Sequence, residues 1–377
     1  MHARTVRHLV SRRTVTLLVA SLGALPGCTA LSGLSELQFE GGSGGSGGAG
    51  GSGGLGGAGG SGGAGGAGSG GAGSGGAGGA GGGCPEGVCG PVEMAVGLNG
   101  PLGIAVDATH IYCAVRGEPG ALNGSVVRVP LDGSDTMPPP LQDGLDEPAR
   151  IAVDSSWVYW TNFAGGKPEA GSVMKVSLDG SDKPPPIATA QSGPFGIAVV
   201  DGDAYWANRT GSRVYGPAVD IAVVGEPNSI AVRNDRVFWS NTTDSSIESW
   251  QFGASAFGNM VSGQAGPTGV AVDDENVYWV NTEGGTVMKA PIAGGGPIEL
   301  ASGQDHPYLI AVDADHVYWT NFGAMGAANG SVMKVPVAGG EALVLAETQD
   351  APTGIAVDET HVYWASEGSG TIVKLPR

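Results

Sequence analysis

The sequence predicts an all-β fold of seven similar four-stranded units spanning residues 91–377. Three observations support this: a motif that recurs seven times, four β-rich runs in each copy, and two chain ends that complement each other. Each copy begins with a leading proline, followed three residues later by an Ile or Val and then by Ala. These Ile or Val reference positions are Ile104, Ile151, Ile197, Ile230, Val270, Ile310 and Ile355. Repeats of this length, broken by Gly, Pro, Asn and Asp, favour stacked antiparallel units.

The sixth copy shows the unit most clearly, with short β-branched or aromatic runs expected as strands at 310–313, 317–321, 331–335 and 343–346. Four antiparallel strands recurring in this way are typical of a β-propeller blade. The Ala after each reference position is expected near the axis, where a larger side chain would overpack. Nine residues after the reference position, Cys113 stands in the first copy, and a Trp expected to fill the gap between blades stands in the others. These are Trp160, Trp206, Trp239, Trp279, Trp319 and Trp364.

The two ends of this region predict how the ring closes. The last copy ends after its third expected strand, 371–375, and has no fourth. Residues 91–97 match, type for type, the fourth strand of the fifth copy at 297–303. We therefore expect the N-terminal strand to complete the C-terminal blade, which removes two exposed strand edges. Because the third copy is short, six blades are the alternative to seven.

The runs Val158–Asn162 and Val317–Asn321 both read Val-Tyr-Trp-Thr-Asn. They resemble the YWTD repeats of LDL-receptor propellers, and the whole unit resembles NHL, SMP-30/gluconolactonase-like and streptogramin-lyase propellers. The resemblance covers residues 91–377 and implies a propeller fold. It implies no particular function, because these families include both binding proteins and enzymes.

The N-terminus predicts export. Residues 1–27 combine four arginines with an apolar run at 15–25, as in a secretory signal peptide. The segment ends in Leu-Pro-Gly-Cys, which resembles a bacterial lipobox and implies that Cys28 is acylated. An ordinary signal peptide with a chance Cys is the alternative. By the same resemblance, Thr29 favours sorting to the outer membrane.

Beyond the lipidated N-terminus, residues 28–40, the segment 41–83 is almost entirely Gly, Ala and Ser. It has too few side chains to bury and is expected to be a disordered tether. The loop 84–90 holds Cys84 and Cys89, close enough for a small disulfide. A metal site is a poorer reading of this pair, because no third or fourth ligand is nearby.

Cys113 is expected to be a buried, inert thiol rather than a nucleophile, because the sequence places no His or cationic residue so as to activate it. Five of the seven copies have an Asp three residues after the reference position, called here the shared Asp slot, and this could suggest calcium binding. We expect these aspartates to accept backbone hydrogen bonds in turns instead. They are Asp107, Asp154, Asp273, Asp313 and Asp358.

Charge restricts the partners. The chain has 36 acidic and 18 basic residues, a net charge of −18. Loss of the four signal-peptide arginines leaves 14 basic residues and a net charge of −22. Such a field disfavours nucleic acid and favours cationic or neutral ligands. It also favours a soluble monomer, attached to the membrane through the lipid anchor alone.

In propellers of these families, the loops leading into the first strands share one face with the loops joining second to third strands. Long second-to-third loops are expected at 116–123, 163–170 and 322–329. Loops on a rigid scaffold often carry binding residues. We predict a site at this channel mouth, although exposed variable residues without a ligand would show the same pattern. Its residues are Glu147, Arg150, Glu226, Asn228, His306, Tyr308, Phe163 and Phe322.

The favoured function is a non-enzymatic module that binds protein, peptide or glycan at the cell envelope, without a cofactor. The alternative is a metal-assisted lyase or lactonase in which His306, with Glu226 or Glu147, holds a divalent cation. One His and two separated Glu are few ligands for such a site. A structural spacer in the envelope is a third possibility.

Overall fold

The computed structural model describes residues 90–137, 139–217 and 219–377. The expected signal peptide, the lipidation site Cys28, the tether and the Cys84–Cys89 pair lie outside these residues. Among the described residues, no helix has the length and hydropathy needed to cross a membrane.

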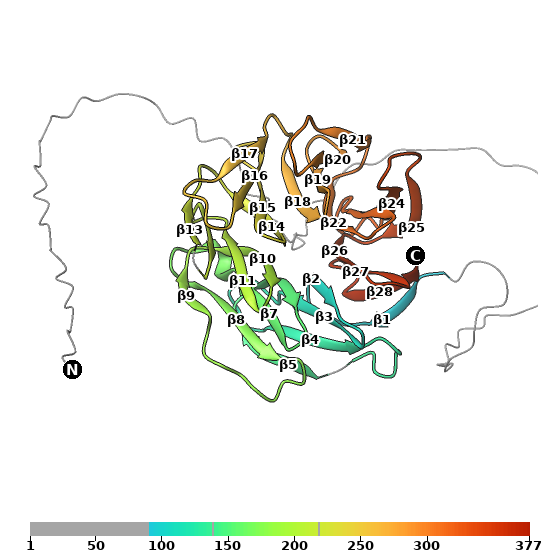
Figure 1. Cartoon of the computed structure of the whole chain (residues 1–377). Coiled ribbons are helices and arrows are strands. Elements are labelled where there is room, and N and C mark those ends of the chain that lie inside the picture. Colours follow the sequence, from blue (N-terminus) through green and yellow to red (C-terminus); the bar gives the residue numbers. More distant parts are fainter. Residues whose placement is uncertain (1–89, 138, 218) are drawn as a thin grey trace, which may run out of the picture. The chain divides into compact units, whose positions relative to one another are not determined.

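Seven four-stranded antiparallel sheets stand around one axis (Figure 1). Blade one contains β2 (Pro101–Val106), β3 (His110–Val115), β4 (Gly124–Pro130) and β5 (Pro140–Leu145). Blade two contains β6 (Pro148–Val153), β7 (Trp157–Asn162), the short 3-10 helix η1 (Ala164–Gly166), β8 (Gly171–Ser177) and β9 (Ala188–Gln191). Blade three contains β10 (Pro194–Val200), β11 (Asp203–Asn208), β12 (Arg213–Gly216) and β13 (Val219–Ala222).

Blade four contains β14 (Pro227–Arg233), β15 (Arg236–Asn241), β16 (Ser246–Gln251) and β17 (Gly258–Val261). Blade five contains β18 (Pro267–Val272), β19 (Asn276–Asn281), β20 (Thr286–Pro291) and β21 (Ile298–Ala301). Blade six contains β22 (Pro307–Val312), β23 (His316–Asn321), β24 (Gly330–Pro336) and β25 (Leu343–Gln349). Blade seven contains β26 (Pro352–Val357), β27 (His361–Ser366), β28 (Thr371–Pro376) and the N-terminal β1 (Val92–Ala95).

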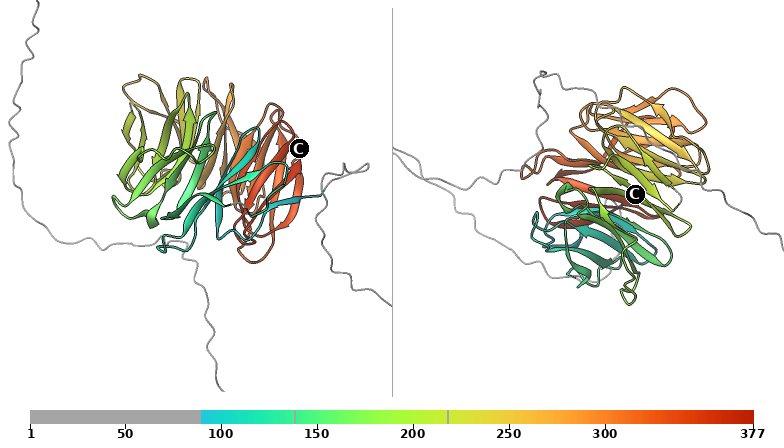
Figure 2. Two further views of the ribbon diagram at one scale, coloured as in Figure 1. Left: turned by 90° about the horizontal axis from the view of Figure 1, so that it is seen from below. Right: turned by 90° about the vertical axis from the view of Figure 1, so that its left-hand side faces the viewer.

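The first strand of every blade lies nearest the axis and packs against the first strands of both neighbouring blades, so the seven form a continuous ring. Side views show neighbouring sheets packed face to face around the ring (Figure 2). The seven-bladed propeller predicted from the sequence is confirmed, and the six-bladed alternative is wrong. The short third copy forms a complete blade with two four-residue strands.

The predicted closure is also confirmed. Strand β1 pairs antiparallel with β28, with Val92 opposite Lys374 and Ala95 opposite Ile372. The side chains of Met94 and Ala95 are buried between blades seven and one. The two ends of the domain therefore share one sheet, and the first and last blades meet at a seam with a common core.

Each interface between blades uses the same four positions. Between blades five and six, Ala271 and Tyr278 of one blade pack with Ile310 and Trp319 of the next. The same combination recurs around the ring, so the tryptophans fill the space between blades as predicted. At the seam, the buried Cys113 takes the place of Trp. Burial raises the pKa of its thiol to about 12, which keeps it protonated and unreactive.

The crowding expected at the Ala position falls instead two residues earlier, at the position just before the Ile or Val reference position. A Cβ added to Gly103 would lie 2.9 Å from the Ala149 carbonyl oxygen of the next blade. A Cβ on Gly354 would lie 2.4 Å from the Leu102 carbonyl oxygen. The Ala side chains are only partly buried and face the next blade. Three blades depart from glycine at the crowded position, with Arg150, Ser229 and Leu309.

Hydrogen bonds to the buried tryptophans also link successive blades. Gln304 of the loop after blade five accepts hydrogen bonds from Trp319 Nε1 (3.0 Å) and Asn321 Nδ2 (2.9 Å) of blade six. Gln191, Gln264 and Gln349 play the same part for the blades that follow them. Blade four instead uses its own Glu248, which accepts from Trp239 Nε1, and burial raises the pKa of this carboxyl.

The shared Asp slot has the predicted local role on the opposite face of the ring. Asp313 Oδ1 accepts the backbone N–H groups of Asp315 and His316, both at 2.8 Å. Its Oδ2 accepts the Tyr318 hydroxyl at 2.8 Å. The other four aspartates of the slot make the same contacts with their own turns and tyrosines. These carboxylates hold the first turn of each blade.

Candidate functional site

One face of the ring, here called the loop face, carries the loops into each first strand and the loops from each second to each third strand. The residue twelve positions after the reference position donates its backbone N–H to the carbonyl of the residue before the leading proline. Phe163 bonds Glu147 in this way at 2.9 Å, and Phe322 bonds His306 at 3.0 Å. The bond is made in every blade, so these seven residues occupy equivalent, fixed positions. They are Arg116, Phe163, Arg209, Thr242, Thr282, Phe322 and Glu367.

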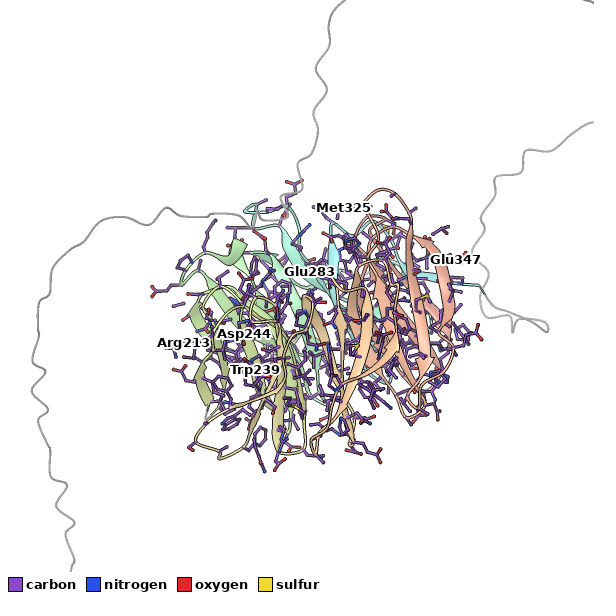
Figure 3. All side chains as sticks on the ribbon, turned by 90° about the horizontal axis from the view of Figure 1, so that it is seen from above. Arg213, Trp239, Asp244, Glu283, Met325 and Glu347 are labelled. Carbon is purple, nitrogen blue, oxygen red and sulfur yellow. The ribbon has the colours of Figure 1, made fainter. Side chains whose placement is uncertain are left out.

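The second-to-third loops of blades one, two and six are the longest, as predicted. In two of them an Asn side chain holds the loop: Asn123 Oδ1 accepts from the Glu118 N–H, and Asn329 Oδ1 from the Ala324 N–H, both at 2.8 Å. Met325 lies in the loop of blade six and reaches the upper rim in Figure 3. Blades six, seven, one and two are contiguous, so the long loops flank one side of the face.

Arg150 connects opposite sides of the ring. Its Nη2 donates to the Tyr308 hydroxyl at 3.0 Å, although blades two and six are not neighbours. Its guanidinium carbon lies 4.5 Å from the centre of the Phe195 ring and 5.3 Å from that of Tyr308. Arg150 is only 7% exposed. Contacts between a guanidinium and aromatic faces offset part of the cost of burying its charge. The side chain thus spans the axis and forms the floor of the loop face.

Arg116 and Glu367 lie beside this floor. They form an ion pair between blades one and seven, and only 7% of the Glu367 side chain is exposed. Burial raises the pKa of the Glu367 carboxyl, whereas the positive charges of Arg116 and Arg150 act in the opposite direction. The two guanidinium groups therefore share one nearby carboxylate. We call Arg116, Arg150, Phe195, Tyr308 and Glu367 the axial cluster.

Aromatic rings flank the cluster on two sides. Phe163 packs edge-on against Phe195, with 5.5 Å between ring centres, and Phe322 packs edge-on against Tyr308 at 5.9 Å. The structure thus brings four of the predicted site residues into one connected group: Arg150 and Tyr308 directly, Phe322 through Tyr308, and Phe163 through Phe195. Such convergence of polar and aromatic groups is typical of binding sites.

The other predicted residues lie outside this connected group. Glu226 pairs with Arg209 at 3.2 Å, and Asn228 donates to Thr242 Oγ1 at 3.4 Å. His306 is mostly exposed and contacts the adjacent Asp305 at 2.7 Å. Glu147, Glu226 and His306 belong to the loops entering blades two, four and six. In the described part of the chain, no three His, Cys, Asp or Glu side chains are grouped as a metal site requires.

Glu147 and His306 share an uncommon backbone geometry. Their φ angles are +52° and +53°, in the left-handed region that favours glycine. Blades one, three and five use Gly100, Gly193 and Gly266 at the same position. A non-glycine residue in this region costs about 1 kcal/mol or more. Ala351 has the same geometry at the equivalent position of blade seven, with a φ angle of +51°, so this geometry is a property of the repeat.

Sequence reasoning missed Phe195, Arg116, Arg209 and Glu367. The last three stand at the same slot as Phe163 and Phe322, twelve residues after the reference position. Comparing this slot across all seven copies would have found them, since it holds two Arg, two Phe and one Glu. Its two threonines, Thr242 and Thr282, donate to carbonyl groups of the next blade.

Comparisons with known proteins agree with the fold. No protein-family model and no curated protein matches the sequence. Among solved structures, a virginiamycin B lyase from Staphylococcus aureus is 18% identical, with a TM-score of 0.61 over 76% of this chain and 98% of its own. A streptogramin B lyase is 16% identical, with a TM-score of 0.59 over 76% and 96%. The designed protein Ika8 is 13% identical, with a TM-score of 0.52 over 76% and 99%.

The chain is thus a seven-bladed β-propeller with the fold of the streptogramin B lyases. At these identities the likeness concerns the fold alone.

Proposed function

We propose that this chain is a non-enzymatic binding module whose loop face takes a protein, peptide or glycan ligand at the axial cluster. The observation that carries the proposal is the Arg150–Tyr308 bond across the axis, flanked by Phe195 and Phe322. A floor held from both sides of the ring presents polar and aromatic groups in a fixed arrangement. Preorganisation of this kind reduces the entropic cost of binding.

A metal-assisted lyase or lactonase is the less favoured alternative. It would need His306 to share a cation with Glu226 or Glu147, yet Glu226 is paired with Arg209 and His306 contacts Asp305. The structural neighbours include lyases, and this keeps the alternative testable. Any ligand found should therefore be checked by mass spectrometry for cleavage.

We further propose that the module is exported and held at the cell envelope, in the outer membrane, by acylation of Cys28 and a tether at 41–83. The lipobox-like Leu-Pro-Gly-Cys and the Gly, Ala and Ser composition of the tether support this. A Gly-rich coil of this length has a root-mean-square reach of about 35 to 40 Å.

Two arginines allow a matched test of the binding face. Arg209 on the loop face pairs with Glu226, and Arg233 on the opposite face pairs with Asp274. The purified chain and its Arg209→Ala, Phe322→Ala and Arg233→Ala variants are screened on peptide and glycan arrays. We expect some array ligands to bind Arg233→Ala as they bind the unmodified chain. For these ligands, Phe322→Ala should lower the affinity by about tenfold or more. The proposal is wrong if only Arg233→Ala weakens binding, or if no loop-face variant does.

A further inference from the structure

We propose that the axial cluster binds one carboxylate of its ligand, the C-terminal carboxylate of a basic peptide segment. This inference rests on the proposed function and specifies its ligand. Three properties of the loop face support it: surplus hydrogen-bond donors, a local positive charge, and a surrounding acidic rim.

The arginines of the axial cluster have more hydrogen-bond donors than the surrounding residues use. A guanidinium has five N–H donors. The contacts of Arg150 within the described chain are Tyr308 Oη at 3.0 Å and the Ala149 carbonyl oxygen at 3.3 Å. Its Nε is buried and has no acceptor among the described residues, and the same is true of Arg116 Nε. Buried donors without partners cost free energy. Nη1 and Nη2 of Arg150 each donate one of these hydrogen bonds and keep a second N–H for a ligand acceptor. A carboxylate suits this need, because its two oxygens can accept two N–H groups of one guanidinium.

The net charge of the axial cluster also favours a carboxylate ligand. Arg116 and Arg150 carry two positive charges, and Glu367, as the ion-pair partner of Arg116, carries one negative charge. The remaining charge is +1, in a chain whose net charge is −18. One additional carboxylate would balance it. Because Arg150 is 7% exposed, the interaction would be poorly screened by solvent.

The rim explains why the rest of the ligand should be basic. Outside the axial cluster, the loops of this face carry nine carboxylates but only two basic side chains, Lys167 and Arg209. An acidic glycan would place its further carboxylates against this rim. A basic peptide with one terminal carboxylate complements both the floor and the rim. The nine are Glu118, Asp146, Glu147, Glu169, Glu226, Asp244, Glu283, Asp305 and Asp350.

The aromatic residues suggest the side chain next to that carboxylate. Phe163 and Phe322 contact the rings that flank Arg150, one from each side. An apolar or aromatic C-terminal residue could pack against either ring while its carboxylate meets the guanidinium. We therefore expect a peptide with basic residues followed by an apolar C-terminal residue.

The test compares peptides on the unmodified chain, so it does not depend on a variant folding. Acetyl-Lys-Lys-Ala-Phe is titrated calorimetrically as the free acid and as the C-terminal amide, beside acetyl-Glu-Glu-Ala-Phe as the free acid. We expect the basic acid to bind about tenfold or more tighter than its amide and than the acidic peptide. The preference for acid over amide should shrink in Arg150→Leu and persist in Arg233→Ala.

Several outcomes would overturn the inference. These are equal binding of acid and amide, tighter binding of the acidic peptide, and no binding of the basic acid up to about 1 mM. If one of these occurs while Phe322→Ala still abolishes capture of an array ligand, the carboxylate inference fails and the proposed binding function stands. If loop-face variants also have no effect on any ligand, both fail.

Discussion

Arg116 and Glu367 occupy equivalent positions in adjacent blades, and their ion pair bridges the seam where the two ends of the domain meet. Close to this pair, Thr353 Oγ1 donates to the Pro101 carbonyl oxygen at 3.0 Å. The seam is therefore held on the loop face by side chains, as well as by the pairing of β1 with β28.

We expect Arg116→Ala to destabilise the domain by about 1.5 to 3 kcal/mol, because the buried Glu367 carboxylate loses its ion-pair partner and keeps only the nearby charge of Arg150. Urea unfolding followed by tryptophan fluorescence measures the change. The double variant Arg116→Ala/Glu367→Ala should recover part of the loss. Strictly additive effects would show that the ion pair contributes nothing at the seam.

Glu248→Gln is expected to stabilise the protein at pH 7, by about 1 kcal/mol. Glutamine keeps an oxygen acceptor for Trp239, as in four other blades, and removes a buried charge. Burial raises the pKa of Glu248, so its ionisation disfavours the folded state. This penalty is absent below the ordinary carboxyl pKa of about 4.3 and grows as pH rises through the raised value.

The advantage of Glu248→Gln should therefore shrink between pH 7 and pH 4, as measured by melting temperature. Glu347→Gln provides the control, because Glu347 is exposed (Figure 3). A Glu248→Gln variant that melts below the unmodified chain at pH 7 would contradict the interpretation.

The fold could be predicted because its signals are local and repeated. A Pro, an Ile or Val, an Ala and a Trp at constant spacing define one blade, and seven copies define the ring. The reason for the small residues was harder to assign. Only the packed ring shows that Gly103 and Gly354, rather than the alanines two residues later, meet the backbone of the next blade.

The site was only partly predictable. Comparing the loops at the leading prolines selected Arg150 and Tyr308 as site residues. The sequence does not reveal that these two side chains, 158 residues apart in the chain, meet at 3.0 Å across the axis. Phe195 was missed because its role depends on its contact with Arg150 of the neighbouring blade. Glu367 was missed because its position was not compared across the seven copies. Glu226 and His306, selected for their chemistry, contact Arg209 and Asp305 instead.

Deleting residues 91–97 is expected to destabilise the domain strongly. The deletion removes β1, exposes the edge of β28 and uncovers the core around Met94. We expect a loss of several kcal/mol, since burial of one large apolar side chain contributes about 2 kcal/mol. Calorimetric melting measures it, and a deletion of the exposed Gly294–Gly296 turn is the control. An unchanged melting temperature would contradict the closing role of β1.

The proposed envelope attachment predicts that Cys28→Ser releases the protein from membranes into the soluble fraction. The thioether-linked lipid cannot form on serine, and stable anchoring takes more than one acyl chain. Ultracentrifugation and immunoblotting of fractionated cells measure the distribution. Cys113→Ser is the matched control, because that thiol is buried. A Cys28→Ser variant still found with the membranes would refute lipid anchoring.

The position of β1 has a mechanical consequence. Tension transmitted along the chain from its N-terminal side reaches the folded domain first at Val92, where β1 is held to β28. The opposing force would act through the ligand bound to the loop face. Pulling would therefore strain the seam before any other blade, and the strength of a tethered attachment would be set by these few backbone hydrogen bonds and the Arg116–Glu367 pair beside them.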